Sequence, residues 1–424
     1  MLYLGIDQHS KQITVCVRDQ DGEVILRRQV STKPEKIASF FGQITDQDRD
    51  FAAIVEVCGF NDWLIDVLRT WNCNDIVLIQ PGKQSKKKTD RRDANKLSEM
   101  LWLNRERLQA GQRPQGLRRV YIPTQEELAN RQITATRKRL AELRTRTLNR
   151  IHRILHRHNL MWEYPTKTFQ TKRGRAWLTQ VALPQVDRIE MDLLTEQWNL
   201  WERQIAQVDE QIVARAGKHA PGDVFSDTDL LRTVPGVSHY SGLALVSRIG
   251  PIERFPRPRS LANFFGLTPG CRNSGNAQHR LGSITKEGSS IVRFHLGQLV
   301  IHVLKRDRVI RQWYRKIKGR RGSKIARVAV MRRITTILWH ILTHREAYSS
   351  GGPPPRLRKP DAIHADQLSA ATCTANEQAA SSARAPRMAQ GSSLSPSLTL
   401  HRIARHLGPP KVVGLVDDVR LDGD

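Results

Sequence analysis

The order of apolar runs in the first hundred residues limits the fold more than any other feature of this sequence. Three β-rich runs come first, LYLGIDQH, ITVCVRDQ and EVILRRQVS, at residues 2–9, 13–20 and 23–31. Asp21 and Gly22 separate the last two runs, and an Asp-Gly pair between apolar runs is a strong hairpin signal. The chain is therefore expected to begin with antiparallel strands.

Helices and strands alternate after this hairpin. A helix is expected from Pro34, with an apolar face formed by Ile37, Phe40, Phe41 and Ile44. The apolar strands FAAIVEV and DIVLIQP follow, separated by a helical segment around Trp63 to Trp71, and a third helix is expected to begin near Asp90. Three strands followed by helix and strand in alternation predict a mixed sheet covered by helices, which is the order of a ribonuclease-H-like fold.

The middle of the chain, from about Gln125 to Val213, is predicted to be helical and polar. Apolar residues three and four positions apart include Leu194, Trp198, Trp201, Ile205, Val208 and Ile212. This spacing suits a long helix packed on a partner helix. Two interpretations remain open, a coiled-coil arm that joins two chains and a helical hairpin within one chain.

The whole chain is predicted to be an α/β plus α protein, because 424 residues suffice for two or three domains of ordinary size. Residues 214–228, rich in Gly, Pro and Asp, are expected to be a linker, and the composition after Ser349 is too poor in large apolar residues to form a core. The expected segments are a mixed-sheet domain at 1–110, a helical or coiled-coil arm at 124–213, a mainly helical C-terminal domain at 228–348 and a disordered tail at 349–424.

The net charge of +28, from 69 Lys and Arg against 41 Asp and Glu, favours a polyanionic partner. A nucleic acid fits best, since each neutralised phosphate releases a counterion. An anionic membrane surface is the alternative, although no apolar run approaches the roughly 20 residues that span a bilayer. The N-terminus lacks a secretory signal pattern, and the five cysteines include no CxxC pair, so a cytoplasmic protein without zinc knuckles is expected.

Four acids are candidates for chemistry. Asp7 and Glu56 lie within apolar strands, where a carboxylate is costly unless it is paired or bound to a metal ion. Asp90 and Asp93 are three positions apart at a predicted helix start, so they share one helix face. Carboxylate oxygens hold hard cations such as Mg²⁺, and two such ions about 3.5 to 4 Å apart support phosphoryl transfer. Purely structural explanations are a capped turn and, for Asp90, a favourable helix dipole.

Basic residues surround these acids and recur on the predicted helix after Gln125. The first group consists of Lys83, Lys86, Lys87, Lys88, Arg91, Arg92 and Lys96. The second consists of Arg137, Lys138, Arg139, Arg144, Arg146, Arg150, Arg153 and Arg157. Either group is a solvated surface or a contact to a nucleic-acid backbone, and the scarcity of interleaved acids in the second group favours a backbone contact.

Three blocks of the sequence carry a resemblance to a known family. GIDQHSKQITV, IVEVCG and KKKTDRRDANKL resemble the three blocks of the DEDD transposases of the insertion-sequence family "one-ten", which also includes the Piv-type DNA invertases. The resemblance covers roughly residues 2–347. It implies a RuvC-like N-terminal domain with Mg²⁺ or Mn²⁺ as cofactor, whose metal-binding acids match Asp7, Glu56, Asp90 and Asp93.

Residues 230–275 and 282–296 resemble the C-terminal transposase domain of the same family. This match implies a serine nucleophile at Ser274, in RNSG, and the nearby Arg280, Lys286 and Arg293 are predicted to bind the attacked strand. The turn at residues 234–237, VPGV, is expected to be helix-hairpin-helix-like, where backbone N–H groups at a helix start hold a phosphate. The sequence departs from the family in its long tail and at Ser289, where the family more often has Asn.

The resemblance also implies partners. These are donor and target DNA, a noncoding guide RNA encoded by the element, and further copies of the chain in a homodimer or tetramer, in the prokaryotic cytoplasm and at the nucleoid. A transposase or site-specific recombinase is therefore the predicted function. Two alternatives are a structure-selective nuclease of the Holliday-junction type, which needs the four acids but not Ser274, and a nucleic-acid-binding protein without activity, which the intact acids disfavour.

Overall fold

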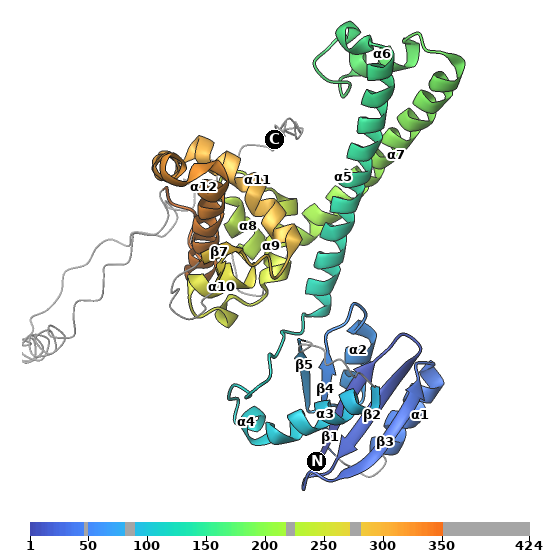
Figure 1. Cartoon of the computed structure of the whole chain (residues 1–424), viewed down its shortest axis with the longest axis vertical. Coiled ribbons are helices and arrows are strands. Elements are labelled where there is room, and N and C mark those ends of the chain that lie inside the picture. Colours follow the sequence, from blue (N-terminus) through green and yellow to red (C-terminus); the bar gives the residue numbers. More distant parts are fainter. Residues whose placement is uncertain (46–49, 81–89, 218–224, 272–280, 351–424) are drawn as a thin grey trace, which may run out of the picture. The chain divides into compact units, whose positions relative to one another are not determined.

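The computed structural model describes residues 1–45, 50–80, 90–217, 225–271 and 281–350, without the side chains of Asp90, Arg91, Cys271 and Leu281 (Figure 1). The tail predicted at 349–424 falls outside the described residues, except for its first two. Within the described ranges, no helix has the length and apolar character needed to cross a membrane.

The N-terminal strands form one five-stranded mixed sheet. They are β1 (Leu2–Gln8), β2 (Gln12–Arg18), β3 (Val24–Ser31), β4 (Phe51–Glu56) and β5 (Asp75–Ile79), in the order β3-β2-β1-β4-β5. β1, β2 and β3 pair antiparallel, whereas β1 pairs parallel with β4 and β4 with β5. The predicted mixed sheet is thus confirmed, and its order is consistent with a ribonuclease-H-like fold.

Helices cover both faces of this sheet. α1 (Pro34–Thr45) and α2 (Asp62–Thr70) pack on the face that carries Leu4, Ile6, Val15 and Val55. α3 (Asp90–Leu103) packs on the opposite face, against Tyr3, Ala52, Ile54 and Val77. The four predicted apolar residues of α1 are all buried, as the helical spacing required. A short helix, α4 (Arg105–Gln109), follows α3.

Gly5 sets the distance between α3 and the sheet. A Cβ atom at this position would lie 2.3 Å from both the carbonyl oxygen of Ala94 and the backbone nitrogen of Ser98. Real Cβ atoms do not approach backbone that closely, so only glycine allows α3 to lie directly on β1.

Two long helices form the middle of the chain and pack against each other (Figure 1). α5 (Gln125–Arg157) begins with a capping box in which Thr124 and Glu127 exchange hydrogen bonds, and α7 (Gln185–Ala216) follows Pro184. Between them lie the 3-10 helix η1 (Leu160–Glu163) and α6 (Lys172–Gln180). On α7, Leu194, Trp198, Ile205 and Ile212 are buried. The hairpin within one chain is therefore formed, whereas a coiled coil between chains stays a prediction.

The C-terminal helices surround one apolar core that includes Leu231, Leu245, Phe265, Leu296, Val330 and Leu338. The helices are α8 (Asp227–Arg232), α9 (His239–Ile249), the 3-10 helix η2 (Ile252–Arg254), α10 (Pro258–Phe264), α11 (Ser290–Arg306) and α12 (Arg308–His344). A two-stranded sheet, β6 (Pro269–Cys271) with β7 (Leu281–Ile284), lies between α10 and α11 in sequence. As predicted, the VPGV turn connects two helices, α8 and α9, and Gly236 takes a φ of 92° there.

A buried histidine makes this C-terminal core sensitive to acid. Burial, and the nearby cations Arg248, Arg137 and Lys138, lower the pKa of His295 from 6.5 to about 3. Between these two pH values the unfolded chain binds a proton here that the folded chain does not, so the free energy of unfolding falls as the pH falls. Below pH 6.5 the loss is about 1.4 kcal/mol per pH unit, or about 2 kcal/mol at pH 5.

Thermal unfolding followed by circular dichroism between pH 7 and pH 5 tests this expectation. In the variant His295→Leu the fall in the free energy of unfolding between pH 7 and pH 5 should be smaller by about 2 kcal/mol, because leucine does not titrate. The variant His156→Gln, at an exposed position of α5, should keep the dependence of the parent chain. Identical curves for the parent and His295→Leu would contradict the assignment.

Candidate functional site

Asp7 and Glu56 lie at the carboxyl ends of the neighbouring parallel strands β1 and β4. The register pairs Ile6 with Val55, so the next position on each strand is occupied by one of the two acids. Side chains alternate between the two faces of a strand. Tyr3 on β1 and Ile54 on β4 face α3, and each lies an even number of positions from the acid on its own strand, so the acids face the same side. The structure therefore brings both predicted acids to one edge of the sheet and to one face of it.

The start of α3 lies toward the same edge. α3 runs back along β1, with Ala94 and Ser98 against Gly5, and with Leu101 in the cluster that contains Tyr3. The first residues of the helix thus lie beyond Gly5, toward Asp7. Asp93, half-buried, belongs to this first turn, and Asp90 is the first helical residue, with its side chain outside the described part of the chain.

The donor chemistry of this edge fits a divalent cation. Asp7 is only 8% exposed, and its Oδ2 atom lies 3.2 Å from Nε2 of His9. A buried carboxylate needs such compensation, and carboxylate oxygens are ligands of hard cations. Among the described side chains, which leave out Asp90, no three His, Cys, Asp or Glu groups are close enough to hold an ion.

A buried amide network, which the sequence did not reveal, ties the ends of β1 and β4 together. Asn61 Nδ2 donates to Gln8 Oε1 at 2.8 Å and to the carbonyl oxygen of Glu56 at 3.0 Å, and Asn61 Oδ1 accepts from the backbone N–H of Cys58 at 2.5 Å. Gln8 Nε2 donates to the carbonyl oxygen of Phe60 at 2.9 Å. An Asn before a helix is expected to be an N-cap, but the side chain of Asn61 makes no capping bond and positions the Glu56 segment instead.

The basic groups predicted near the acids are only partly described. Lys86, Lys87 and Lys88 lie outside the described residues, as does the side chain of Arg91. Arg92 is exposed on the first turn of α3. Arg92, beside Asp93, and the exposed Lys96 are the described part of that prediction.

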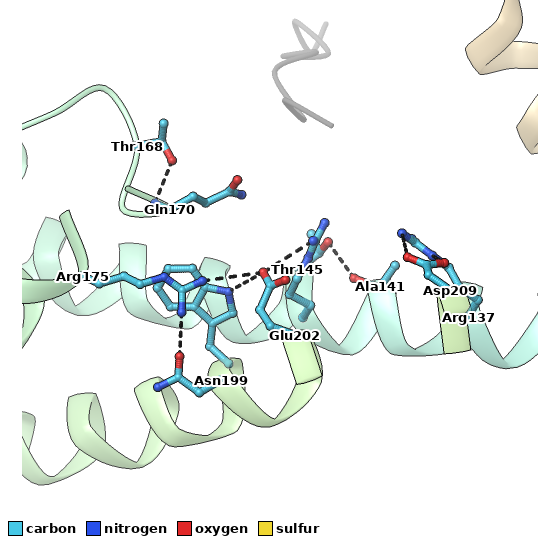
Figure 2. Close-up of polar contacts among 11 residues, drawn as sticks. Arg137, Ala141, Thr145, Thr168, Gln170, Arg175, Asn199, Glu202 and Asp209 are labelled. Carbon is cyan, nitrogen blue, oxygen red and sulfur yellow. Dashed lines mark hydrogen bonds and ion pairs between the residues drawn. The ribbon is translucent and has the colours of Figure 1, made fainter. Parts of the chain in front are cut away.

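Acids on α7 neutralise about half of the basic face of α5. Ion pairs join Arg137 to Asp209 at 3.1 Å, Arg144 to Glu202 at 3.6 Å, Arg150 to Glu190 at 2.8 Å and Arg157 to Asp187 at 2.6 Å. Figure 2 shows Asp209 against Arg137, and Glu202 and Asn199 against Arg175. Although few acids are interleaved on α5, these arginines therefore have acidic partners, which come from a helix 30 to 72 residues later in sequence.

Part of that basic face remains open. A hollow of about 290 Å³ is lined by Arg146, Asn149, Arg150 and Arg153. Arg146 and Arg153 are exposed, and no carboxylate of the described residues forms an ion pair with either of them. Arg146 and Arg153 thus line one concave surface of α5 together with Arg150, which pairs with Glu190.

The predicted site of the C-terminal domain is described only at its borders. Ser274 and Arg280 lie outside the described residues, after β6 and before β7. Lys286 is exposed at a φ of 56°. Arg293 Nη1 donates to the carbonyl oxygens of Phe265, Glu287 and Gly288, at 3.2, 3.3 and 3.0 Å. These bonds show that Arg293 holds the segment between β7 and α11 in place. Its predicted contact with DNA would be an additional role.

Comparisons with known proteins agree with this arrangement. Residues 4–160 match the family model DEDD_Tnp_IS110, described as a transposase, and residues 228–315 match the model of the transposase IS116/IS110/IS902 family. The chain is 27% identical over 357 residues to the transposase for insertion sequence element IS1111A of Coxiella burnetii, covering 82% of this chain and 91% of that protein. It is 26% identical over 364 residues to a probable family 20 transposase of Pseudomonas aeruginosa, covering 82% and 98%. The chain therefore belongs to the DEDD transposases of the IS110 type and is a DNA transposase.

Proposed function

We propose that this chain cuts and rejoins DNA strands in two steps, with metal-bound acids in the N-terminal domain and a serine nucleophile in the C-terminal domain. The observation that carries the proposal is the placement of Asp7 and Glu56 on one face of neighbouring parallel strands, with the first turn of α3 toward the same edge. The working division is a RuvC-like domain at 1–110, an arm at 124–213 and a C-terminal domain at 228–348.

Membership of the DEDD family supports dependence on a divalent metal ion, and we propose Mg²⁺ or Mn²⁺ at Asp7, Glu56, Asp90 and Asp93. When bound there, the ion supplies activation of the attacking oxygen and stabilisation of the leaving oxygen. The chain provides the carboxylates, and the Gln8 and Asn61 amides keep the ends of β1 and β4 in place. His9 stabilises the Asp7 carboxylate from the solvent side.

Ser274 would carry out the covalent step. Its Oγ attacks a DNA phosphodiester, so a bond from Oγ to phosphorus forms while the bond from phosphorus to a deoxyribose oxygen breaks. The serine proton passes to a base and from the base to the departing deoxyribose oxygen, which leaves as a hydroxyl. Attack by the hydroxyl of a second DNA strand on the phosphoserine reverses these changes and releases the serine. The phosphoserine ester retains the free energy of the phosphodiester bond that was cut, so rejoining needs no other energy source.

A guide RNA encoded by the element is proposed as the partner that selects sequence. The family resemblance implies it, and the concave surface with the exposed Arg146 and Arg153, beside the pair of Arg150 with Glu190, supports a contact to a phosphate backbone. Because such contacts are made regardless of sequence, base pairing between the RNA and both DNA partners would supply the specificity.

A dimer or tetramer is proposed for the active complex. α7 exposes Val186, Ile189, Leu193 and Leu200, which follow one another at helical spacing beside the face that packs on α5. A second copy of the chain could cover this stripe.

Replacing Ser274 with Ala tests the covalent step. The purified chain would be incubated with the RNA flanking its element, Mg²⁺, and labelled donor and target DNA. The parent chain is expected to give a recombinant product and a covalent protein–DNA species, and Ser274→Ala neither, because alanine has no nucleophile. Ser290→Ala serves as the matched control, at an exposed serine that begins α11. Cleavage that persists in Ser274→Ala but requires Asp7 would make the chain a metal-dependent nuclease and remove Ser274 from the mechanism.

A further inference from the structure

A pocket of about 390 Å³ lies beside the acids, on the same side of the sheet as α3. Its lining residues come from β2, β3 and the first turns of α3, and they include Thr14, Cys16, Arg27, Gln29, Arg92 and Asn95. β2 is the strand next to β1, and the antiparallel register pairs Thr14 directly with Asp7. The pocket therefore begins one strand away from Asp7.

The charge of this pocket is positive. Arg27 and Arg92 are both exposed, and none of the described residues that line the pocket is an acid. Arg27 donates to the neutral amide oxygen of Asn95 at 3.3 Å, and within the described ranges no carboxylate pairs with either arginine. Arg28 also lines the pocket, but its guanidinium donates to Gln43 of α1, on the other side of the sheet. Two arginines thus remain available for an anion.

Thr14 supplies a second and independent indication of a ligand. It is 3% exposed, and its Oγ1 atom is buried without any hydrogen-bond partner among the described residues. A buried hydroxyl without a partner destabilises a fold, so such a group needs an explanation. Thr14 lines the pocket but its Oγ1 atom is not accessible from it in this structure, so a rotation of the side chain about χ1 would bring the hydroxyl to a ligand oxygen and provide the missing partner.

We infer that this pocket binds a phosphodiester group of the DNA strand that is cut, close to the phosphate held at the acids. Strands lie about 4.8 Å apart, so Arg27 on β3 lies about 10 Å from β1, within the reach of a neighbouring phosphate of one strand. Arg27 and Arg92 would neutralise that phosphate, and Thr14 would donate to one of its oxygens. The inference rests on the proposed function and adds to it a site that fixes the register of the strand relative to the acids.

A charge-coupling experiment on the full chain tests the inference. Labelled DNA with the sequence of the element's end would carry one neutral methylphosphonate linkage, moved through the strand one position at a time. Affinity would be measured with the flanking RNA present and without divalent metal. In the parent chain one linkage near the cleavage position is expected to weaken binding about tenfold. In the double variant Arg27→Gln, Arg92→Gln the same linkage should not weaken DNA binding any further, because the arginines that contact it are absent.

Two controls accompany this scan. Lys36→Gln removes one positive charge from an exposed position of α1, on the opposite face of the sheet, and should keep the tenfold effect. A parallel scan of the RNA should show no linkage whose effect depends on Arg27 and Arg92. Dependence in the RNA instead of the DNA would overturn the assignment to the cut strand.

Thr14→Val separates a ligand from a structural defect. Valine has nearly the shape of threonine without the hydroxyl, so the variant is expected to melt a few degrees higher and to bind the DNA more weakly. Thr335→Val is the matched control, since Thr335 is also buried but its hydroxyl donates to the carbonyl oxygen of Met331. Removing this hydroxyl should not raise the melting temperature.

The outcomes of these experiments are distinct from a failure of the proposed function. If the neutral linkage and the two arginine substitutions weaken binding additively at every position, the proposed phosphate site is wrong. This conclusion would hold even if Asp7 and Ser274 prove essential. Coupling at one DNA linkage would support the pocket, even if no recombinant product or protein–DNA adduct is found.

Discussion

Asp7→Asn is expected to reduce strand cleavage on the order of 10³-fold, because the loss of one charged group that stabilises a phosphoryl-transfer transition state has effects of this size. The substitution keeps the shape of the side chain but removes its negative charge, and with it one of the four carboxylate ligands of the proposed site. Cleavage of labelled donor DNA in Mg²⁺, measured in a single turnover, is the direct assay.

The fold should survive this substitution. Asp7 is buried, and an amide in its place removes a charge that is costly to bury, so the melting temperature of Asp7→Asn is expected to equal or exceed that of the parent chain. Asp50→Asn, at an exposed position before β4, is the matched control and should retain full cleavage. A stable Asp7→Asn variant that still cleaves at the parental rate would remove Asp7 from the metal site.

Gly5→Ala is expected to cost about 3 kcal/mol of stability and to lower cleavage at least about 100-fold. The new methyl group would lie 2.3 Å from backbone atoms of Ala94 and Ser98, so α3 must move away from β1. The first turn of α3 carries Asp90 and Asp93, and a displacement of about 1 Å is enough to cost 10²-fold in a positioned reaction. Thermal unfolding and the cleavage assay measure the two effects.

Gly42→Ala controls for the loss of a glycine in the same domain. Gly42 lies on α1, and a Cβ atom there would meet only a ring atom of Trp71, at an ordinary distance of 3.7 Å. This variant should be as stable as the parent or more stable by about 0.4 to 1 kcal/mol, with unchanged cleavage. If Gly5→Ala behaved like Gly42→Ala, the close approach of α3 would have no part in forming the site.

Local patterns in the sequence were sufficient for the order of elements and for the residue types of the candidate site. Short β-rich and apolar runs indicated the five strands, helical spacing indicated the buried face of α1, and the Asp21-Gly22 pair indicated the hairpin between β2 and β3. These features depend on neighbours along the chain, which is why they could be predicted. Asp7 and Glu56 were conspicuous for the same reason, as charges within apolar runs.

Contacts between distant segments could be learned only from the tertiary structure. The glycine at position 5 has no local signature, yet it lets α3 reach β1, and Asn61, in the position of a helix cap, instead joins the ends of two strands. On α5 the scarcity of interleaved acids favoured a contact to a nucleic-acid backbone, but acids of α7, far along the sequence, pair with several of its arginines.

The same reason explains why the pocket of Arg27 and Arg92 had no counterpart in the sequence. The two arginines are 65 positions apart and are brought together by the packing of α3 on the hairpin of β2 and β3. Sequence by itself thus determined which side chains this transposase has for chemistry and on which elements they lie. Tertiary packing decided which of those charges are neutralised and which remain available to a nucleic acid, because charges far apart in the chain meet only in the folded protein.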